Sequence, residues 1–206
     1  MAVRDTVFPF LYDHLGRLVE RELAGRRRAV LARARGRVLE IGVGTGFNLA
    51  HYPPAVQELT ITDPAPGMLR RATERAQALR RPVHAIEASA ERLPFDDRSF
   101  DTVVSTLVLC SVEDQDKALS EIWRVLKPGG QLLFIEHVRA DESRLVRWQD
   151  RLERPWGLVA GGCHPNRPTL ERIRAASFEV QELEHGKLPK SPPIVRPLIS
   201  GYARAR

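Results

Sequence analysis

The feature that most restricts the fold of this chain is an apolar segment that leads directly into three alternating glycines. Residues 38–41 form the apolar run, which includes one acid, Glu40, and the glycines follow as Gly42, Gly44 and Gly46. The run predicts a buried strand, and the glycines allow a sharp turn whose backbone can press against a ligand. A helix after this turn would point its free N–H groups at the same place. The segment therefore predicts a nucleotide-cofactor loop.

The spacing of the glycines indicates which cofactor the loop binds. A dinucleotide-binding loop has its third glycine or alanine three residues after the second, and this chain has the bulky Phe47 there. The observed spacing, Glu-x-Gly-x-Gly-x-Gly, resembles the first motif of class I S-adenosylmethionine (SAM) methyltransferases. The resemblance implies SAM contacts from the following residues of this segment: Glu40, Gly42, Gly44, Thr45 and Gly46.

Strands and helices alternate along most of the chain. We expect strands at residues 38–41, 59–62, 83–87, 102–106, 131–137, 178–183 and 199–203, and helices at residues 8–34, 48–51, 67–79, 114–126, 142–151 and 169–176. Such alternation predicts a parallel sheet with helices on both faces. With the resemblance, it implies a Rossmann-like, doubly wound α/β fold. We expect seven mostly parallel strands, of which the last is antiparallel.

Length and composition favour one compact domain. A chain of 206 residues suits a single domain. Within it we expect an N-terminal helical segment (1–36), a cofactor-binding half (37–140) and an acceptor-side half (141–206). The glycine- and proline-rich stretch at 155–168 suggests a loop, and residues 148–168 are either a lid over the acceptor pocket or an ordinary connection. The sequence does not define the oligomeric state.

Charge and cysteine content narrow the classes of partner. The net charge of +6 comes from arginines spread over helical segments, and no aromatic residues interleave the basic run at 26–37, so we expect no nucleic-acid binding. Two cysteines, Cys110 and Cys163, fit a reducing compartment, and no apolar stretch approaches the roughly 20 residues that span a bilayer. We therefore expect a cytoplasmic protein. Cys163 and His164 lack further ligands at zinc spacing, so we expect no metal site.

Two more segments agree with a SAM pocket. Asp63 ends the second expected strand, where a carboxylate can accept both ribose hydroxyls of an adenosine; alternatively, it caps the turn at Pro64. Residues 88–101 resemble the segment that passes the adenine ring in class I methyltransferases, although many members have aspartate in place of Ser89. The adenine contact is therefore expected from the backbone of Ala90 and from Met68, while Thr106 and Leu107 would meet the methionine end.

Further segments resemble the mammalian microsomal thiol S-methyltransferases. They include residues 106–112, Glu136-His137-Val138, Gly162-Cys163 and the tail at 195–203, and the match runs from about residue 37 to the C-terminus. Those proteins carry a hydrophobic N-terminal membrane anchor, which we do not expect here. Peripheral association with a membrane stays open.

The chemistry of methyl transfer bears on the acceptor. Transfer from a sulfonium mainly requires alignment of donor and acceptor and exclusion of water. A thiol, with a pKa of about 8.5, supplies some thiolate at neutral pH without a strong base. A nitrogen or carbon acceptor requires a placed base, for which the candidates are Glu136 and His137 at the carboxyl end of the fifth strand, and His164.

The sequence thus predicts a SAM-dependent methyltransferase that acts on a small lipophilic acceptor, with a thiol favoured. One alternative is an N- or C-methyltransferase acting on a phospholipid headgroup or a quinone, because residues 93–95 with 99–101 also resemble the quinone-methylating group. A second alternative is a SAM-binding protein without catalysis.

Overall fold

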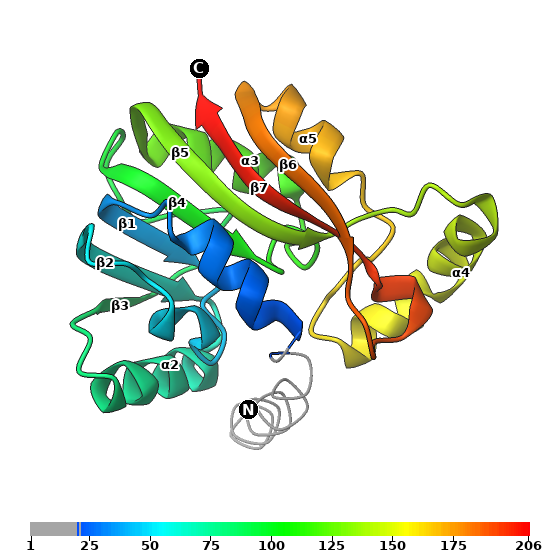
Figure 1. Cartoon of the computed structure of the whole chain (residues 1–206), viewed down its shortest axis with the longest axis horizontal. Helices are drawn as coiled ribbons and strands as arrows, with labels where there is room; N and C mark the ends of the chain where they lie inside the picture. Colours follow the sequence, from blue (N-terminus) through cyan, green and yellow to red (C-terminus); the bar gives the residue numbers. More distant parts are fainter. Residues whose placement is uncertain (1–19, 21) are drawn as a thin grey trace.

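The computed structural model describes residue 20 and residues 22–206. Their strands form one seven-stranded sheet with the order β3-β2-β1-β4-β5-β7-β6 (Figure 1). The bounds of the strands are β1 (Gly36–Ile41), β2 (Val56–Asp63), β3 (His84–Glu87), β4 (Phe100–Thr106), β5 (Leu126–His137), β6 (Phe178–Lys187) and β7 (Pro197–Ala205). The last strand, β7, is antiparallel to both of its neighbours. The other pairs are parallel, which confirms the predicted fold class.

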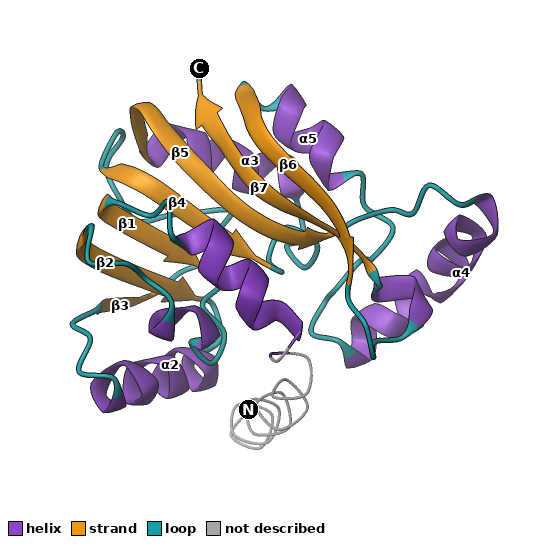
Figure 2. Cartoon of the chain, in the orientation of Figure 1, coloured by secondary structure: helices purple, strands orange, loops and turns teal. Residues whose placement is uncertain are grey.

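Helices cover both faces of the sheet (Figure 2). Successive side chains of a strand point to opposite faces, and β1 follows this rule: Val38 packs in a cluster with Leu31, whereas Leu39 packs in a cluster with Ile122. The first cluster also holds side chains from α2 (Pro66–Ala78), and the second includes α3 (Gln115–Val125) and α5 (Thr169–Ala175). The single-turn helix η1 (Phe47–Ala50) follows the glycine loop. These layers place the carboxyl ends of β1, β2 and β4 side by side.

The helix expected at residues 8–34 lies partly outside the described residues. Its described part is helical over residues 22–31. There Leu23 packs against Ile135 of β5 and Leu198 of β7, so this helix covers the centre of one sheet face.

Helix α4 (Ser143–Val159) extends further than the sequence predicts. The expected end at residue 151 and the expected loop from residue 155 are both wrong, because the helix continues through Pro155. Leu145, Leu152 and Trp156 recur at helical spacing on both sides of the proline and pack into one apolar cluster, which favours a continuous helix. The helix stands off the sheet (Figure 1) and contacts the body through η2 (Pro193–Val195).

Strand β5 begins earlier than expected. The sequence predicts a helix stop at Lys127-Pro128-Gly129-Gly130 and a strand from residue 131, but β5 already begins at Leu126. Phe100 of β4 pairs with Leu126, and the register shifts before Gln131, so the turn residues lie inside an irregular strand. Strands β6 and β7 are also longer than predicted, because they pair with each other over nearly their whole length.

We expect the pairing of β6 with β7 to depend on Gly201. A Cβ atom at this position would overlap the carbonyl oxygen of Glu182, so Gly201→Ala should lower the free energy of unfolding by about 2 kcal/mol. Urea denaturation followed by circular dichroism measures this loss. The control is Gly157→Ala in α4, where the nearest atom to an added Cβ is the Cys163 carbonyl oxygen at 3.7 Å. This control should be neutral or slightly stabilising; equal losses in both variants would contradict the prediction.

Candidate functional site

The glycine loop after β1 leaves no room for side chains at two of its positions. Gly42 and Gly46 have φ angles of 54° and 82°, in the left-handed region that favours glycine. A Cβ at Gly42 would lie 2.6 Å from Cγ2 of Val108, and one at Gly46 would lie 2.7 Å from Cδ1 of Leu49. The loop is therefore packed between η1 and the segment after β4, as a cradle for a close-lying ligand requires.

Asp63 lies at the carboxyl end of β2 and binds the glycine loop. Its Oδ2 accepts a hydrogen bond of 2.9 Å from the Gly44 N–H, and its Oδ1 accepts one of 2.9 Å from the Ala65 N–H. The expected turn cap is thus present. Each carboxylate oxygen can accept a further hydrogen bond, so Asp63 could bind ribose hydroxyls at the same time. Burial raises the pKa of this carboxyl.

A buried polar network supports the loop from below, and Asn48 lies at its centre. The Asn48 amide donates to Glu40 (2.9 Å) and to Thr106 Oγ1 (3.0 Å), and its oxygen accepts from Arg27 (2.6 Å). Glu40 also accepts a 2.6 Å hydrogen bond from the Tyr52 hydroxyl. Burial raises the pKa of Glu40 to about 7. The roles of Arg27, Asn48 and Tyr52 could not be predicted from the sequence, because no motif connects residues at these separations.

The adenine side of the predicted pocket follows β3. Ser89 forms a local turn in which its Oγ accepts from the Glu91 N–H at 3.3 Å and lies 3.2 Å from the Glu91 carboxylate. These contacts with Glu91 agree with the expectation that the Ser89 hydroxyl contributes little to the adenine contact. Ala90 and Met68 are buried, whereas Pro64 is exposed.

A buried carboxylate at the end of β5 holds the segment after β4. Glu136 Oε1 accepts from the Ser105 hydroxyl (2.7 Å) and the Val108 N–H (3.1 Å), and Oε2 accepts from the Cys110 N–H (3.2 Å). Leu107, which lies between the Ser105 donor and the two backbone donors, has a φ of 59°. The hydrogen bonds to Glu136 keep the Val108 side chain against the backbone of Gly42. Glu136 thereby links the end of β5 to the glycine loop.

The residues present fit the adenosyl and methionine parts of SAM. The loop has the close-packed glycines, Asp63 lies at the position of a ribose-binding acid, and the buried Thr45 Oγ1 has no hydrogen-bond partner among the described residues. The network of Glu40 and Asn48 reaches Thr106, which is expected at the methionine end.

Comparison with known proteins gives the same result. The methyltransferase domain family matches residues 39–134. Human thiol S-methyltransferase TMT1A is 34% identical over 208 residues, which cover 95% of this chain and 85% of that protein. Demethylmenaquinone methyltransferase from Thermus thermophilus is 40% identical over 177 residues, or 80% of each chain. This chain belongs to the class I SAM-dependent methyltransferases. The enzyme class and the cofactor predicted from the sequence are thereby confirmed.

A solved structure shows the same fold. Geranyl diphosphate C-methyltransferase from Streptomyces coelicolor, determined with Mg²⁺, geranyl diphosphate and S-adenosyl-L-homocysteine, superposes with a TM-score of 0.70 at 13% identity. The match covers 89% of this chain and 78% of that one. Between residues 22 and 206, no helix of the methyltransferase is long and apolar enough to cross a bilayer. The same residues contain no cluster of three histidine, cysteine or acidic side chains that could hold a metal ion.

Two thiols and a carboxylate–imidazole pair come together where the loop after β4 meets the segment after α4. The sulfurs of Cys110 and Cys163 lie 3.8 Å apart, and both residues are buried. His164 Nδ1 lies 2.5 Å from the Glu153 carboxylate of α4, and the His164 N–H donates to the Cys110 carbonyl oxygen at 2.7 Å. The loop after β4 and the end of α4 therefore meet at this point.

His137 differs from His164 in being buried. Burial lowers the pKa of His137 to about 4, so its ring is neutral near pH 7. Its Nδ1 has no hydrogen-bond partner among the described residues. His137 and Glu136 are thus both buried at the end of β5.

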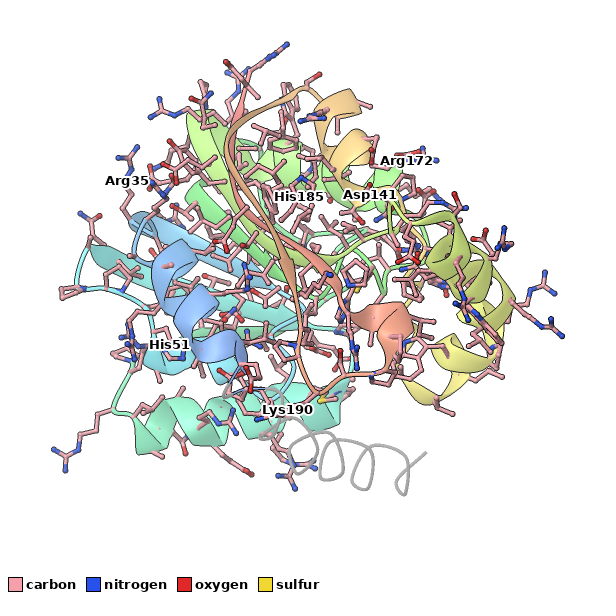
Figure 3. The ribbon with its side chains drawn as sticks, turned by 45° about the vertical axis from the view of Figure 1, so that its right-hand side comes forward. Arg35, His51, Asp141, Arg172, His185 and Lys190 are labelled. Atoms are coloured by element: carbon pink, nitrogen blue, oxygen red, sulfur yellow. The ribbon has the colours of Figure 1, made fainter. Side chains whose placement is uncertain are left out.

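A cavity of about 1260 Å³ opens between α4 and the ends of β6 and β7. Figure 3 labels Asp141 and His185, which lie on two of its walls. Four of its lining residues also belong to the apolar cluster that contains Leu107: Leu145, Leu152, Trp156 and Ile194. The cluster thus connects the cavity to Leu107, the residue expected at the methionine end. Further apolar walls come from Trp148, Leu198 and Ile199.

Removal of the Asp63 carboxylate should weaken SAM binding at least tenfold, because both the ribose contact and the link to Gly44 are lost. Isothermal titration calorimetry measures the dissociation constant. Asp97→Ala, at an exposed carboxylate paired with Arg124, is the control.

An analogue that lacks a ribose hydroxyl separates the two effects of Asp63→Ala. The wild type should bind this analogue less tightly than it binds S-adenosylhomocysteine. Asp63→Ala should bind the two compounds equally tightly. If removal of the hydroxyl lowers affinity equally in both proteins, Asp63 does not bind the ribose.

The stability of the fold should fall with rising pH because of Glu40. Its pKa is raised from 4.5 to about 7, so the unfolded chain ionises first. The contribution of protonated Glu40 to the free energy of unfolding is greatest below pH 4.5 and is lost as the pH rises to 7. In Glu40→Gln the loss of unfolding free energy between pH 5 and 7 should be smaller by about 2 kcal/mol.

Urea denaturation at a series of pH values measures this difference. Glu179→Gln, at an exposed position of β6, should keep the wild-type pH dependence. An unchanged pH dependence in Glu40→Gln would show that Glu40 ionises normally in the folded protein.

Proposed function

We propose that this methyltransferase transfers the methyl group of SAM to the sulfur of a small lipophilic thiol. The human relative at 34% identity is a thiol S-methyltransferase, and the apolar walls of the cavity beside α4 suit a lipophilic acceptor. When bound, SAM supplies an electrophilic methyl group on a sulfonium. We also propose a cytoplasmic location, which the two free thiols support.

The thiol proposal rests on the hydrogen bonds that occupy the Glu136 carboxylate. Its two oxygens accept hydrogen bonds from Ser105, Val108 and Cys110, so it is better placed to position the loop than to remove a proton. The pKa of about 4 likewise makes His137 a weak base. A thiol tolerates this arrangement because it supplies its own thiolate near neutral pH.

The proposal assigns the SAM contacts to residues around the glycine loop. Gly42 and Gly46 would allow the backbone to approach SAM, Asp63 would accept the ribose hydroxyls, and Leu107 would lie near the methionine end. The remaining assigned residues are Glu40, Gly44, Thr45, Pro64, Met68, Ser89, Ala90 and Thr106. Exclusion of water from the reacting atoms favours the reaction of a thiolate with a sulfonium, because the attraction between the two charges is stronger in a medium of low dielectric constant.

A second candidate is C-methylation of a quinol, and the pair of Glu153 with His164 favours it. A carbon acceptor requires a base, and a carboxylate 2.5 Å from an imidazole can orient the ring towards an acceptor. The Thermus thermophilus relative is a demethylmenaquinone methyltransferase. The two candidates make opposite predictions for His164.

An acceptor panel distinguishes the candidates. The wild type is assayed with labelled SAM and an alkyl thiol, a quinol, a primary amine and an ethanolamine phospholipid. We expect the thiol to be methylated with the highest kcat/KM, which should rise with pH towards the thiol pKa of about 8.5. His164→Asn should lower the rate with the thiol less than about tenfold, whereas loss of a general base should cost about 100-fold or more.

His84→Asn, at an exposed residue of β3 on the far side of the sheet, is the control for the histidine substitution. Preferred methylation of the quinol, with a loss of about 100-fold or more in His164→Asn, would establish the second candidate in place of the thiol. Bound SAM without transfer to any of the four acceptors would reject both.

A further inference from the structure

Helix α4 presents a row of unpaired arginines to solvent. Arg144, Arg147, Arg151 and Arg154 are exposed and follow one another at spacings of three and four residues, so they lie on one face of the helix. None has a hydrogen-bond or ion-pair partner among the described residues, whereas many other arginines of the chain do. This face therefore carries four uncompensated positive charges.

The acids of α4 point elsewhere. Asp150 pairs with Arg139 at 2.7 Å, and Glu153 lies 2.5 Å from His164. On a helical wheel of 100° per residue, both acids fall outside the sector of the four arginines. The positive face is thus free of acids over the full length of the helix.

Large apolar side chains are exposed beside the arginines. Leu158 is 87% exposed, Val159 is 71% exposed and Trp148 is 49% exposed. The opposite face of the helix, with Leu152 and Trp156, already packs against the body of the protein. Trp148 also lines the cavity, but packing does not account for Leu158 and Val159, which lie at the end of the row of arginines.

We propose that the outer face of α4 docks on an anionic phospholipid surface. A helix with arginines on its polar side and tryptophan and aliphatic residues beside them matches the composition of helices that lie in the membrane interface. The arginines would face the lipid phosphates, and Leu158 and Val159 would enter the acyl boundary. An RNA or an acidic protein would complement the charges but would leave these aliphatic side chains exposed.

The position of α4 allows this contact. The helix has 17 residues, about 25 Å in length, and stands off the sheet as an arm (Figure 1). The cavity lies between this arm and the ends of β6 and β7. A bilayer on the outer face would thus lie beside the cavity without covering the glycine loop.

Vesicle co-sedimentation tests the proposal with the full chain. The vesicles contain phosphatidylcholine alone or with 30% phosphatidylglycerol, about the share of anionic lipid needed to attract basic segments. The wild type should bind the anionic vesicles at least tenfold more tightly, and binding should weaken as the salt concentration rises. The double variant Arg147→Glu with Arg151→Glu should lose at least tenfold in partition coefficient.

A matched pair of substitutions controls for net charge. Arg70→Glu with Arg174→Glu makes the same charge change at two exposed arginines of α2 and α5, and it should lower partition less than about threefold. Leu158→Ser should lower binding, whereas Leu79→Ser, at a residue 44% exposed after α2, should not. Unchanged SAM affinity in every variant shows that the fold is intact.

Three results would overturn the proposal. The first is wild-type binding by the α4 double variant, and the second is an equal loss in the two double variants. The third is tight binding to a polyanion such as polyuridylic acid with none to anionic vesicles, which would indicate a nucleic-acid or acidic partner. None of these results depends on which acceptor is methylated, so the proposed function is tested separately.

Discussion

The hydrogen bonds to the buried carboxylate of Glu136 join the end of β5 to the loop after β4 and, through that loop, to the glycine loop. The carboxylate at the end of β5 accepts from Ser105 of β4 and from two backbone N–H groups of the next loop. That loop begins at Leu107 in the left-handed region, a conformation that costs of order 1 kcal/mol for a non-glycine residue. The hydrogen bonds offset this cost. They also keep Val108 against Gly42, where a side chain on the glycine could not fit.

Three buried acids accept hydrogen bonds at the carboxyl edge of the sheet. Glu40 accepts from Asn48 and Tyr52, Asp63 accepts from Gly44, and Glu136 accepts from the loop after β4. Burial raises the pKa of each, because a low dielectric disfavours the charged form. Their hydrogen-bond donors oppose this shift. The carboxylates of Asp63 and Glu136 therefore fix backbone N–H groups, whereas the Glu40 carboxylate fixes the side chains of Asn48 and Tyr52.

The cofactor half could be predicted from the sequence because its chemistry is local. Gly42, Gly46 and Asp63 stand at fixed distances from two strand ends, and parallel strands bring those ends together. The network through Arg27 and Asn48 could not be predicted, since it depends on how the helix at residues 22–31 crosses the sheet. The continuation of α4 beyond Pro155 was also missed, because packing of Trp156 outweighed the local preference of proline.

The proposed acceptor cavity depends on contacts of longer range than those of the glycine loop. Residues Leu107, Trp156 and Ile194 meet in one cluster, although they come from the loop after β4, from α4 and from η2. A change in the angle of α4 would alter the cavity on one side of this cluster without moving Gly42 or Asp63 on the other. The proposed acceptor cavity can therefore change while Gly42 and Asp63 stay in place, which agrees with relatives that are thiol and demethylmenaquinone methyltransferases.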